Sequence, residues 1–110
     1  MSNLHLVDIT ADNLAQEPIR KGFGRGLLQA GKQNDQVVAL CADLTESTQI
    51  HLFANEFPER YVEVGIAEQN LVTVAAGLAA MGKIPFTSSY AAFSPGRNWE
   101  QFKTTACLNN

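Results

Sequence analysis

The stretch over residues 61–81 constrains the fold most, because its apolar pattern changes from strand-like to helical within a few residues. Residues 61–64 (YVEV) are aromatic and β-branched around one acid, which is typical of a β-strand. Gly65 interrupts this run, and from Ala67 onward the apolar residues recur at steps of three and four. The stretch therefore predicts a strand, a tight turn and a helix, with Glu68 in the first helical turn.

The rest of the chain repeats this alternation of strands and helices. Residues 37–41 (VVALC) form a continuous apolar run, as expected of a strand covered on both faces in a parallel sheet, and residues 83–88 form a third strand-like run. Helical patterns occupy residues 19–30, 46–57 and 98–108. Strand–helix alternation predicts parallel strands joined by right-handed crossovers. The predicted fold class is therefore α/β, with a parallel β-sheet flanked by helices.

The sequence also predicts where the first helix ends, how its glycines pack, and which residues of the last helix face the core. The first helix is expected to stop at Gly31. A phosphate-binding loop is a poor interpretation of its glycine-rich start, because no strand precedes it. Gly22 and Gly26 are four residues apart, so we expect them to allow close packing of this helix. In the last helix the inward-facing residues are predicted to be Trp99, Phe102 and Ala106.

Composition limits the classes of function. The net charge of −3 does not indicate a nucleic-acid-binding surface or a polybasic membrane patch, and no apolar run reaches the ~20 residues of a membrane span. Cys41 and Cys107 form no metal or redox motif, so a cytoplasmic location is expected. Three strand-like runs are few for a sheet of this class. We therefore expect residues 18–110 to be the first part of a truncated domain. Residues 1–17 are only weakly periodic, so we expect them to form an arm.

Chemically suitable side chains follow each of the three predicted strands. The segments are residues 42–47 (ADLTES), 65–69 (GIAEQ) and 89–97 (SYAAFSPGR). Parallel strands bring such segments together at one edge of the sheet, where α/β proteins bind their ligands. Glu68 has two interpretations: a solvated acid favoured by the helix dipole, or a partly buried acid with a function. The convergence of the three segments favours a site.

Residues 59–70 (ERYVEVGIAEQN) and 75–86 (AAGLAAMGKIPF) resemble the pyrimidine-binding domain of transketolase-type thiamine diphosphate enzymes. The resemblance covers residues 18–110 and implies that thiamine diphosphate is the cofactor. It assigns the family's catalytic acid to Glu68, which would hydrogen-bond the ring nitrogen of the cofactor's aminopyrimidine and favour its reactive tautomer. It also places Ile66, from the same G-I-x-E segment, against the cofactor.

The resemblance implies roles for further residues of the three segments. In the family's A-D-L-x-x-S pattern, Asp43 lies close to the cofactor, Leu44 supports its bent shape and Ser47 holds a substrate phosphate. Arg20 matches a second phosphate-binding position, for which its planar fork is suited. On residue type alone, a helix cap explains Asp43 and Ser47, and a solvated charge or ion pair explains Arg20.

The aromatic residues Tyr90 and Phe93 match family positions that surround the aminopyrimidine, although phenylalanine is usual at Tyr90. Core packing is the ordinary alternative for both. Offset stacking on a flat ring gains roughly 0.5–1.5 kcal/mol beyond area burial. Arg97 also fits a family pattern, but a structural ion pair explains it equally well, so no catalytic role is assigned to it.

The family's metal-binding G-D-G segment is missing from this sequence, so no metal ligands are assigned here. The resemblance therefore implies that a separate diphosphate-binding subunit holds Mg²⁺ or Ca²⁺, in a homodimer or heterotetramer with the strand-end edge and the small-residue helix at an interface. The implied activity is transketolase, the transfer of a two-carbon ketol unit between phosphorylated sugars. Alternatives are a deoxyxylulose-phosphate synthase-like enzyme, a dehydrogenase E1 β-like enzyme, or a module that kept the fold without catalysis.

Overall fold

The middle strand of the sheet, β1 (Val37–Cys41), is buried along its whole length in the computed structural model, which describes residues 10–14 and 16–109. It pairs in parallel with β2 (Tyr61–Glu63) on one side and with β3 (Ile84–Ser88) on the other, in the order β2-β1-β3. The predicted parallel sheet is confirmed, and all three strands lie within one residue of their expected bounds.

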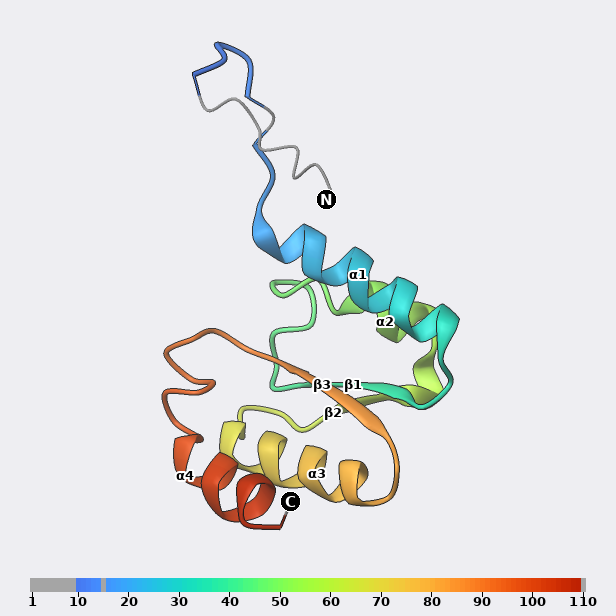
Figure 1. Cartoon of the computed structure of the whole chain (residues 1–110), viewed down its shortest axis with the longest axis vertical. Helices are drawn as coiled ribbons and strands as arrows, with labels where there is room; N and C mark the ends of the chain where they lie inside the picture. The colour runs from blue at the N-terminus through green and yellow to red at the C-terminus, as the bar shows by residue number, and fades with distance from the viewer. Residues whose placement is uncertain (1–9, 15, 110) are drawn as a thin grey trace, which may run out of the picture.

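Helices cover both faces of this sheet (Figure 1). α1 (Ile19–Gln33) and α2 (His51–Glu56) lie on one face, and α3 (Glu68–Ala80), α4 (Trp99–Gln101) and the following π-helix η2 (Phe102–Cys107) lie on the other. Successive β1 side chains point to opposite faces. Val37, Ala39 and Cys41 therefore pack in the core beneath α1 and α2, while Val38 and Leu40 pack in the core beneath α3.

The first helix differs from the prediction at its glycines. It continues through Gly31 to Gln33, because Gly31 is buried inside the helix against the rings of Phe53 and Phe57. The expectation that Gly22 and Gly26 allow close packing is wrong for the described part of the chain, where nothing lies within 4 Å of a Cβ atom at either glycine. Gly24 is the close-packed residue instead: a Cβ atom there would lie 2.6 Å from the Gln49 carbonyl oxygen.

The two other predicted helices are shorter or less regular than expected. The pattern at residues 46–57 becomes turns followed by α2, because Asp43 and Gln49 adopt positive φ angles of 57° and 65° and turn the chain before His51. The pattern at residues 98–108 becomes a short α4 that widens into a π-helix, which changes the helical register. Phe102 and Ala106 are half-buried, but Trp99 is 71% exposed, so its predicted inward orientation is wrong.

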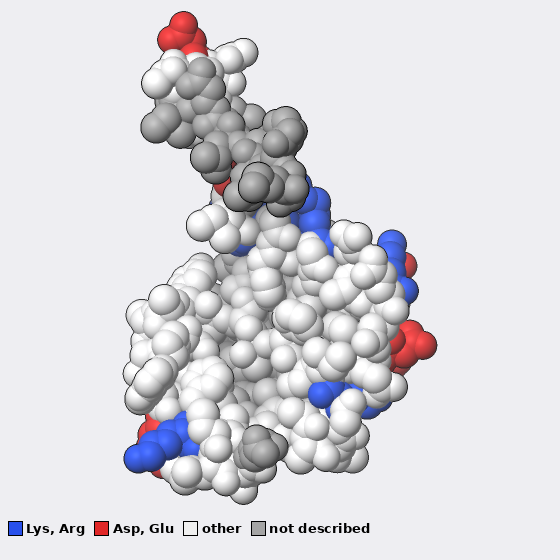
Figure 2. All heavy atoms as spheres, in the orientation of Figure 1, with Lys and Arg blue, Asp and Glu red and all other residues white. Residues whose placement is uncertain are grey.

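The face of the molecule shown in Figure 2 is almost free of charged side chains, which lie around its rim. Strand β3 is an edge of the described sheet, and two of its large apolar residues, Ile84 and Phe86, are 43% and 37% exposed. None of the described helices is both long enough and apolar enough to cross a membrane.

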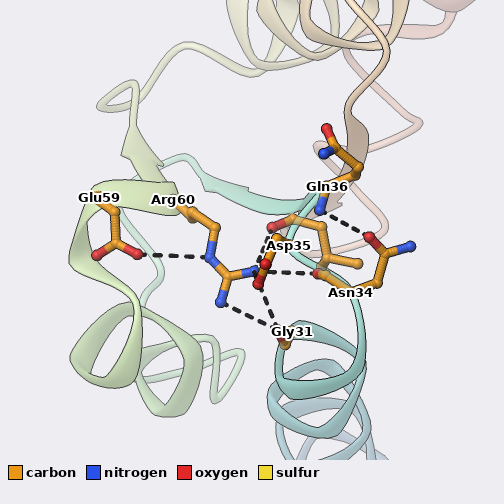
Figure 3. Close-up of polar contacts among 7 residues, drawn as sticks. Gly31, Asn34, Asp35, Gln36, Glu59 and Arg60 are labelled. Atoms are coloured by element: carbon orange, nitrogen blue, oxygen red, sulfur yellow. Dashed lines mark hydrogen bonds and ion pairs between the residues drawn. The ribbon is translucent and has the colours of Figure 1, made fainter.

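Arg60 ties the end of α1 to the sheet from the 3-10 helix η1 (Pro58–Arg60), as Figure 3 shows. Its guanidinium donates two hydrogen bonds of 3.1 Å to the Gly31 carbonyl oxygen and one of 3.2 Å to that of Asn34. The guanidinium carbon lies 3.8 Å from the centre of the Phe57 ring. The last carbonyl groups of a helix lack hydrogen-bond donors within the helix. Here the Arg60 guanidinium is the donor for two carbonyl groups at the end of α1.

The predicted arm over residues 1–17 lies mostly outside the described residues, which omit 1–9 and 15. Its described part, residues 10–14 and 16–17, forms turns and irregular chain without a helix or strand.

Candidate active site

The three strands end at the same level, so the segments that follow them meet at one edge of the sheet. Cys41, the last residue of β1, is in register with Glu63 and with Ser88, the last residues of β2 and β3. The three segments leave the sheet on the same side in Figure 1. The predicted convergence of residues 42–47, 65–69 and 89–97 is confirmed.

Glu68 is the first residue of α3, and its side chain is only 3% exposed. Its Oε2 atom lies 3.3 Å from Nη1 of Arg97, which donates a hydrogen bond to it. Buried carboxylates are rarely left without such a partner. Burial excludes the interpretation of Glu68 as a solvated acid, and Arg97 forms the ion pair that the sequence suggested.

Asn98 fixes the backbone beneath Glu68. Its side chain is fully buried, and Nδ2 donates to the Glu68 carbonyl oxygen at 2.9 Å and to Ser94 Oγ at 3.1 Å. One amide group therefore joins the start of α3 to the segment after β3. This role has no local signal in the sequence, because asparagine is an ordinary residue at the start of a helix.

A cavity of about 500 Å³ opens beside Glu68. Its lining includes Ile66, Thr73, Arg97 and Gln101. Ile66 is 75% exposed there, and Gln101 Oε1 is buried without a hydrogen-bond partner among the described residues. The cavity thus offers a buried carboxylate, an open apolar side chain and a free amide oxygen to a ligand.

A second cavity, of about 510 Å³, brings together the two residues assigned to substrate phosphate. Arg20 from α1 and Ser47 from the segment after β1 line it, together with Tyr90 from the segment after β3. Ser89 also lines this cavity, and its buried Oγ has no hydrogen-bond partner in the described part of the chain. The lining therefore combines a cation with hydroxyl groups, which suits an anion.

The remaining three predicted site residues line neither cavity. Asp43 is exposed and sits at φ 57°. Leu44 is partly buried against the core beneath α1 and α2. Phe93 stacks on Tyr90 with ring centres 6.2 Å apart and planes at 24°. The cofactor contacts assigned to these residues stay predictions.

Glu63 holds two of the strand-end segments together and was missed by the sequence analysis. Its carboxylate accepts hydrogen bonds from the backbone N–H groups of Asp43 and Gly65 and from the hydroxyls of Thr45 and Tyr61. Burial by itself raises the pKa of Glu63, but these four hydrogen bonds lower that pKa by more, so its net shift is downward. The position of an acid at the end of a strand, two residues before Gly65, was the available signal.

The described residues contain no group of three or more His, Cys, Asp and Glu side chains that could hold a metal ion.

Comparison with known proteins identifies the family. The model of the transketolase pyrimidine-binding domain matches residues 16–110. A protein of Methanocaldococcus jannaschii, provisionally named a transketolase C-terminal section, is 52% identical over 74% of this chain and 26% of its own length. A 6-deoxy-6-sulfo-D-fructose transketolase subunit of Clostridium sp. strain MSTE9 is 48% identical over 68% of this chain and 23% of its own length.

Further matches come from an enzyme and a solved structure. A 1-deoxy-D-xylulose-5-phosphate synthase of Syntrophus aciditrophicus is 43% identical over 80% of this chain and 13% of its own length. A split-gene transketolase, solved as an inactive β4 tetramer, superposes with a TM-score of 0.72 and 47% identity, over 82% of this chain and 30% of that chain. The chain thus spans about a quarter or less of the curated relatives' length. The chain belongs to the transketolase pyrimidine-binding domain family.

Proposed function

We propose that this chain supplies the pyrimidine-binding half of a transketolase, which transfers a two-carbon ketol unit between a ketose phosphate and an aldose phosphate with thiamine diphosphate. The observation that carries the proposal is the burial of Glu68 at the head of α3, beside an open cavity at the carboxyl ends of the strands. A carboxyl group in that position can exchange a proton with a ring nitrogen that enters the cavity.

The residues around Glu68 fit the pyrimidine half of the cofactor. Glu68 and the free Oε1 atom of Gln101 offer hydrogen bonds, and the exposed Ile66 offers an apolar contact. The stacked rings of Tyr90 and Phe93 lie on the neighbouring segment. When bound, thiamine diphosphate supplies the carbanion chemistry of the reaction. Glu68 holds a proton at the pyrimidine ring nitrogen, and the other groups orient the ring.

The diphosphate half of the cofactor finds no equivalent support in the described residues, which offer no cluster of metal ligands. Mg²⁺ on a diphosphate typically binds phosphate oxygens and one or two carboxylates. We therefore assign Mg²⁺ or Ca²⁺ to a diphosphate-binding partner subunit. The similarity to a split-gene transketolase that is inactive as a β4 tetramer supports this division.

The cavity lined by Arg20 and Ser47 is assigned to the anionic end of the sugar. Arginine binds phosphate through two parallel hydrogen bonds, and a hydroxyl such as that of Ser47 adds a third. A sulfonate presents a similar set of oxygens. The relative that is a 6-deoxy-6-sulfo-D-fructose transketolase subunit therefore makes a sulfonated ketose a second candidate donor.

The similarity to deoxyxylulose-phosphate synthases keeps a different reaction open, the condensation of pyruvate with an aldose phosphate. The higher identities, 52% and 48%, are to proteins named as transketolases, and this favours ketol transfer. A dehydrogenase E1 β-like enzyme would also use Glu68. A non-catalytic module would keep the fold without binding the cofactor.

An assay of the complete subunit with its diphosphate-binding partner, thiamine diphosphate and Mg²⁺ separates these activities. Ketol transfer from a ketose phosphate or a 6-sulfo ketose to an aldose phosphate is the expected result. Pyruvate condensation without ketol transfer would replace the proposal with a synthase. Failure to bind thiamine diphosphate with any candidate partner would favour the non-catalytic module.

A further inference from the structure

We infer that Glu63 is a positioning residue that sets the backbone of the Asp43 segment and of the Gly65 turn, and so places the groups of the active site. This inference rests on the proposed function for its catalytic consequence, but its structural part can be measured separately. Glu63 touches neither of the two cavities described above; it acts through the residues that it holds.

The two carboxylate oxygens of Glu63 have separate sets of donors. Oε1 accepts from the backbone N–H of Asp43 at 2.7 Å and from that of Gly65 at 2.8 Å. Oε2 accepts from the hydroxyl of Tyr61 at 2.8 Å and from that of Thr45 at 3.2 Å. Glu63, at the end of β2, therefore joins the segment after β1 to the turn that leads into α3.

Both backbone groups that Oε1 binds belong to residues with a left-handed conformation. Asp43 has φ 57° and Gly65 has φ 70°. Gly65 adopts this conformation without steric cost, whereas Asp43 carries a Cβ atom and is strained. The hydrogen bond to Glu63 offsets part of that strain. The Gly65 turn continues directly into the helix, since Ala67 N–H donates to the Gly65 carbonyl oxygen at 2.7 Å, one residue before Glu68.

The chemistry of the four groups that bind the Glu63 carboxylate predicts which substitutions are tolerated at this position. The two backbone N–H groups can only donate, so an oxygen must face them. The hydroxyls of Thr45 and Tyr61 can donate or accept, so they can rotate to meet an NH₂ group. Glutamine therefore satisfies all four partners with its oxygen toward the backbone. Alanine satisfies none of them.

The functional test compares Glu63→Ala and Glu63→Gln in the complete enzyme with its partner subunit, and Glu56→Ala is the matched control. Glu56 is an exposed acid of α2 whose carboxylate lies 3.6 Å from Lys32 Nζ. For Glu63→Ala we expect weaker thiamine diphosphate binding and kcat lower by roughly 10- to 100-fold, because small displacements of reacting groups have effects of that size. The KM for the phosphorylated acceptor should rise less than kcat falls, since Arg20 lies on α1 and only Ser47 lies on the segment that Glu63 holds.

Glu63→Gln should recover most of the lost kcat and cofactor affinity, and Glu56→Ala should match the wild type. Equal kcat and cofactor affinity in Glu63→Ala and Glu56→Ala would overturn the inference. So would a glutamine variant as impaired as the alanine variant, because loss of charge, rather than of position, would then explain both.

Hydrogen exchange separates this inference from the proposed function. In the complete subunit, Glu63→Ala should accelerate exchange at the amides of Asp43 and Gly65, while Glu63→Gln and Glu56→Ala leave both protected. This result requires no enzymatic activity. A wild-type enzyme without ketol transfer would disprove the proposed function alone, whereas unchanged exchange at both amides in Glu63→Ala would disprove the positioning role.

Discussion

Arg97 Nη1 lies 3.3 Å from Glu68 Oε2, and the two side chains differ sharply in exposure: 56% for the arginine and 3% for the acid. The acid is therefore fixed at the head of α3, while its partner extends from the wall of the cavity into solvent. A ligand that enters this cavity meets a carboxylate that Arg97 already holds in place, and the buried acid keeps this partner because an unpaired buried charge is costly.

Glu68→Gln should lower turnover by roughly 100-fold or more, which is the scale of a lost proton-transfer group. The fold should persist, because glutamine has the same size and the exposed Arg97 is hydrated without its partner. Steady-state turnover with a circular dichroism melt measures both effects, and Glu56→Gln, at an exposed acid of α2 that lines neither cavity, is the control. Near-normal turnover in Glu68→Gln would remove the catalytic assignment.

The sheet and the position of Glu68 were predictable because they depend on local patterns. The continuous apolar run of β1 and the change of period around Gly65 each occur within a few residues. The meeting of the three segments that follow the strands was predictable, because parallel strands bring such segments to one edge of the sheet. The convergence of Arg20 and Ser47 on one cavity required the family resemblance, since each has an ordinary explanation by itself.

The parts that could not be predicted depend on contacts between residues far apart in sequence. Arg60, Glu63 and Asn98 each bind backbone groups that only the folded chain brings within reach. Gly22, Gly26 and Gly31 were misjudged because periodicity cannot tell which side of α1 faces α2. The π-helical turn after Gln101 likewise has no local signal, and it changes the register on which the orientation of Trp99 was predicted.

Arg20→Ala should raise the KM for phosphorylated sugars by roughly 10- to 100-fold, the equivalent of a charged hydrogen bond, and Ser47→Ala should raise it less. Affinity for thiamine diphosphate should not change in either variant. Lys21→Ala, an exposed cation on the same helix, is the control. If the KM for an unphosphorylated sugar rises equally, the assignment to phosphate is wrong.

Arg60→Lys should lower the free energy of unfolding by roughly 1–3 kcal/mol, because one ammonium group cannot replace the fork that binds the Gly31 and Asn34 carbonyl oxygens. The Arg60 side chain is only 12% exposed, so water compensates poorly. Urea unfolding of the complete subunit measures this change. Arg25→Lys is the control. The Arg25 guanidinium also donates from two nitrogens, in this case to the Glu17 carboxylate, but its side chain is 61% exposed. Little change in stability is therefore expected for Arg25→Lys. Equal stability of Arg60→Lys and wild type would show that the fork is dispensable.

The stability difference between wild type and Glu63→Ala should depend on pH. The pKa of Glu63 is lowered in the folded chain, so its ionised form stabilises the fold above the unfolded pKa, about 4.3. That contribution is lost as the pH falls through the lower, folded pKa. Unfolding measured from about pH 7 down to about pH 3 should therefore show the difference shrinking. A difference that stays constant or grows toward low pH would contradict the role of the ionised carboxylate.

The complete subunit that contains this chain should bind thiamine diphosphate only weakly without its partner. The described residues offer a buried acid, an apolar side chain and two stacked rings to the pyrimidine, but no group of ligands for a metal on the diphosphate. One hydrogen bond with some stacking gains little beyond the entropic cost of association, which is at least about 4 kcal/mol. Calorimetric titration of thiamine diphosphate with Mg²⁺ into the subunit, alone and then with the diphosphate-binding partner, measures the difference. Glu68→Gln serves as the control for specific binding in the mixed sample. Tight binding by the subunit alone would show that the metal and diphosphate are held by this polypeptide, and the division of the site between two chains would be wrong.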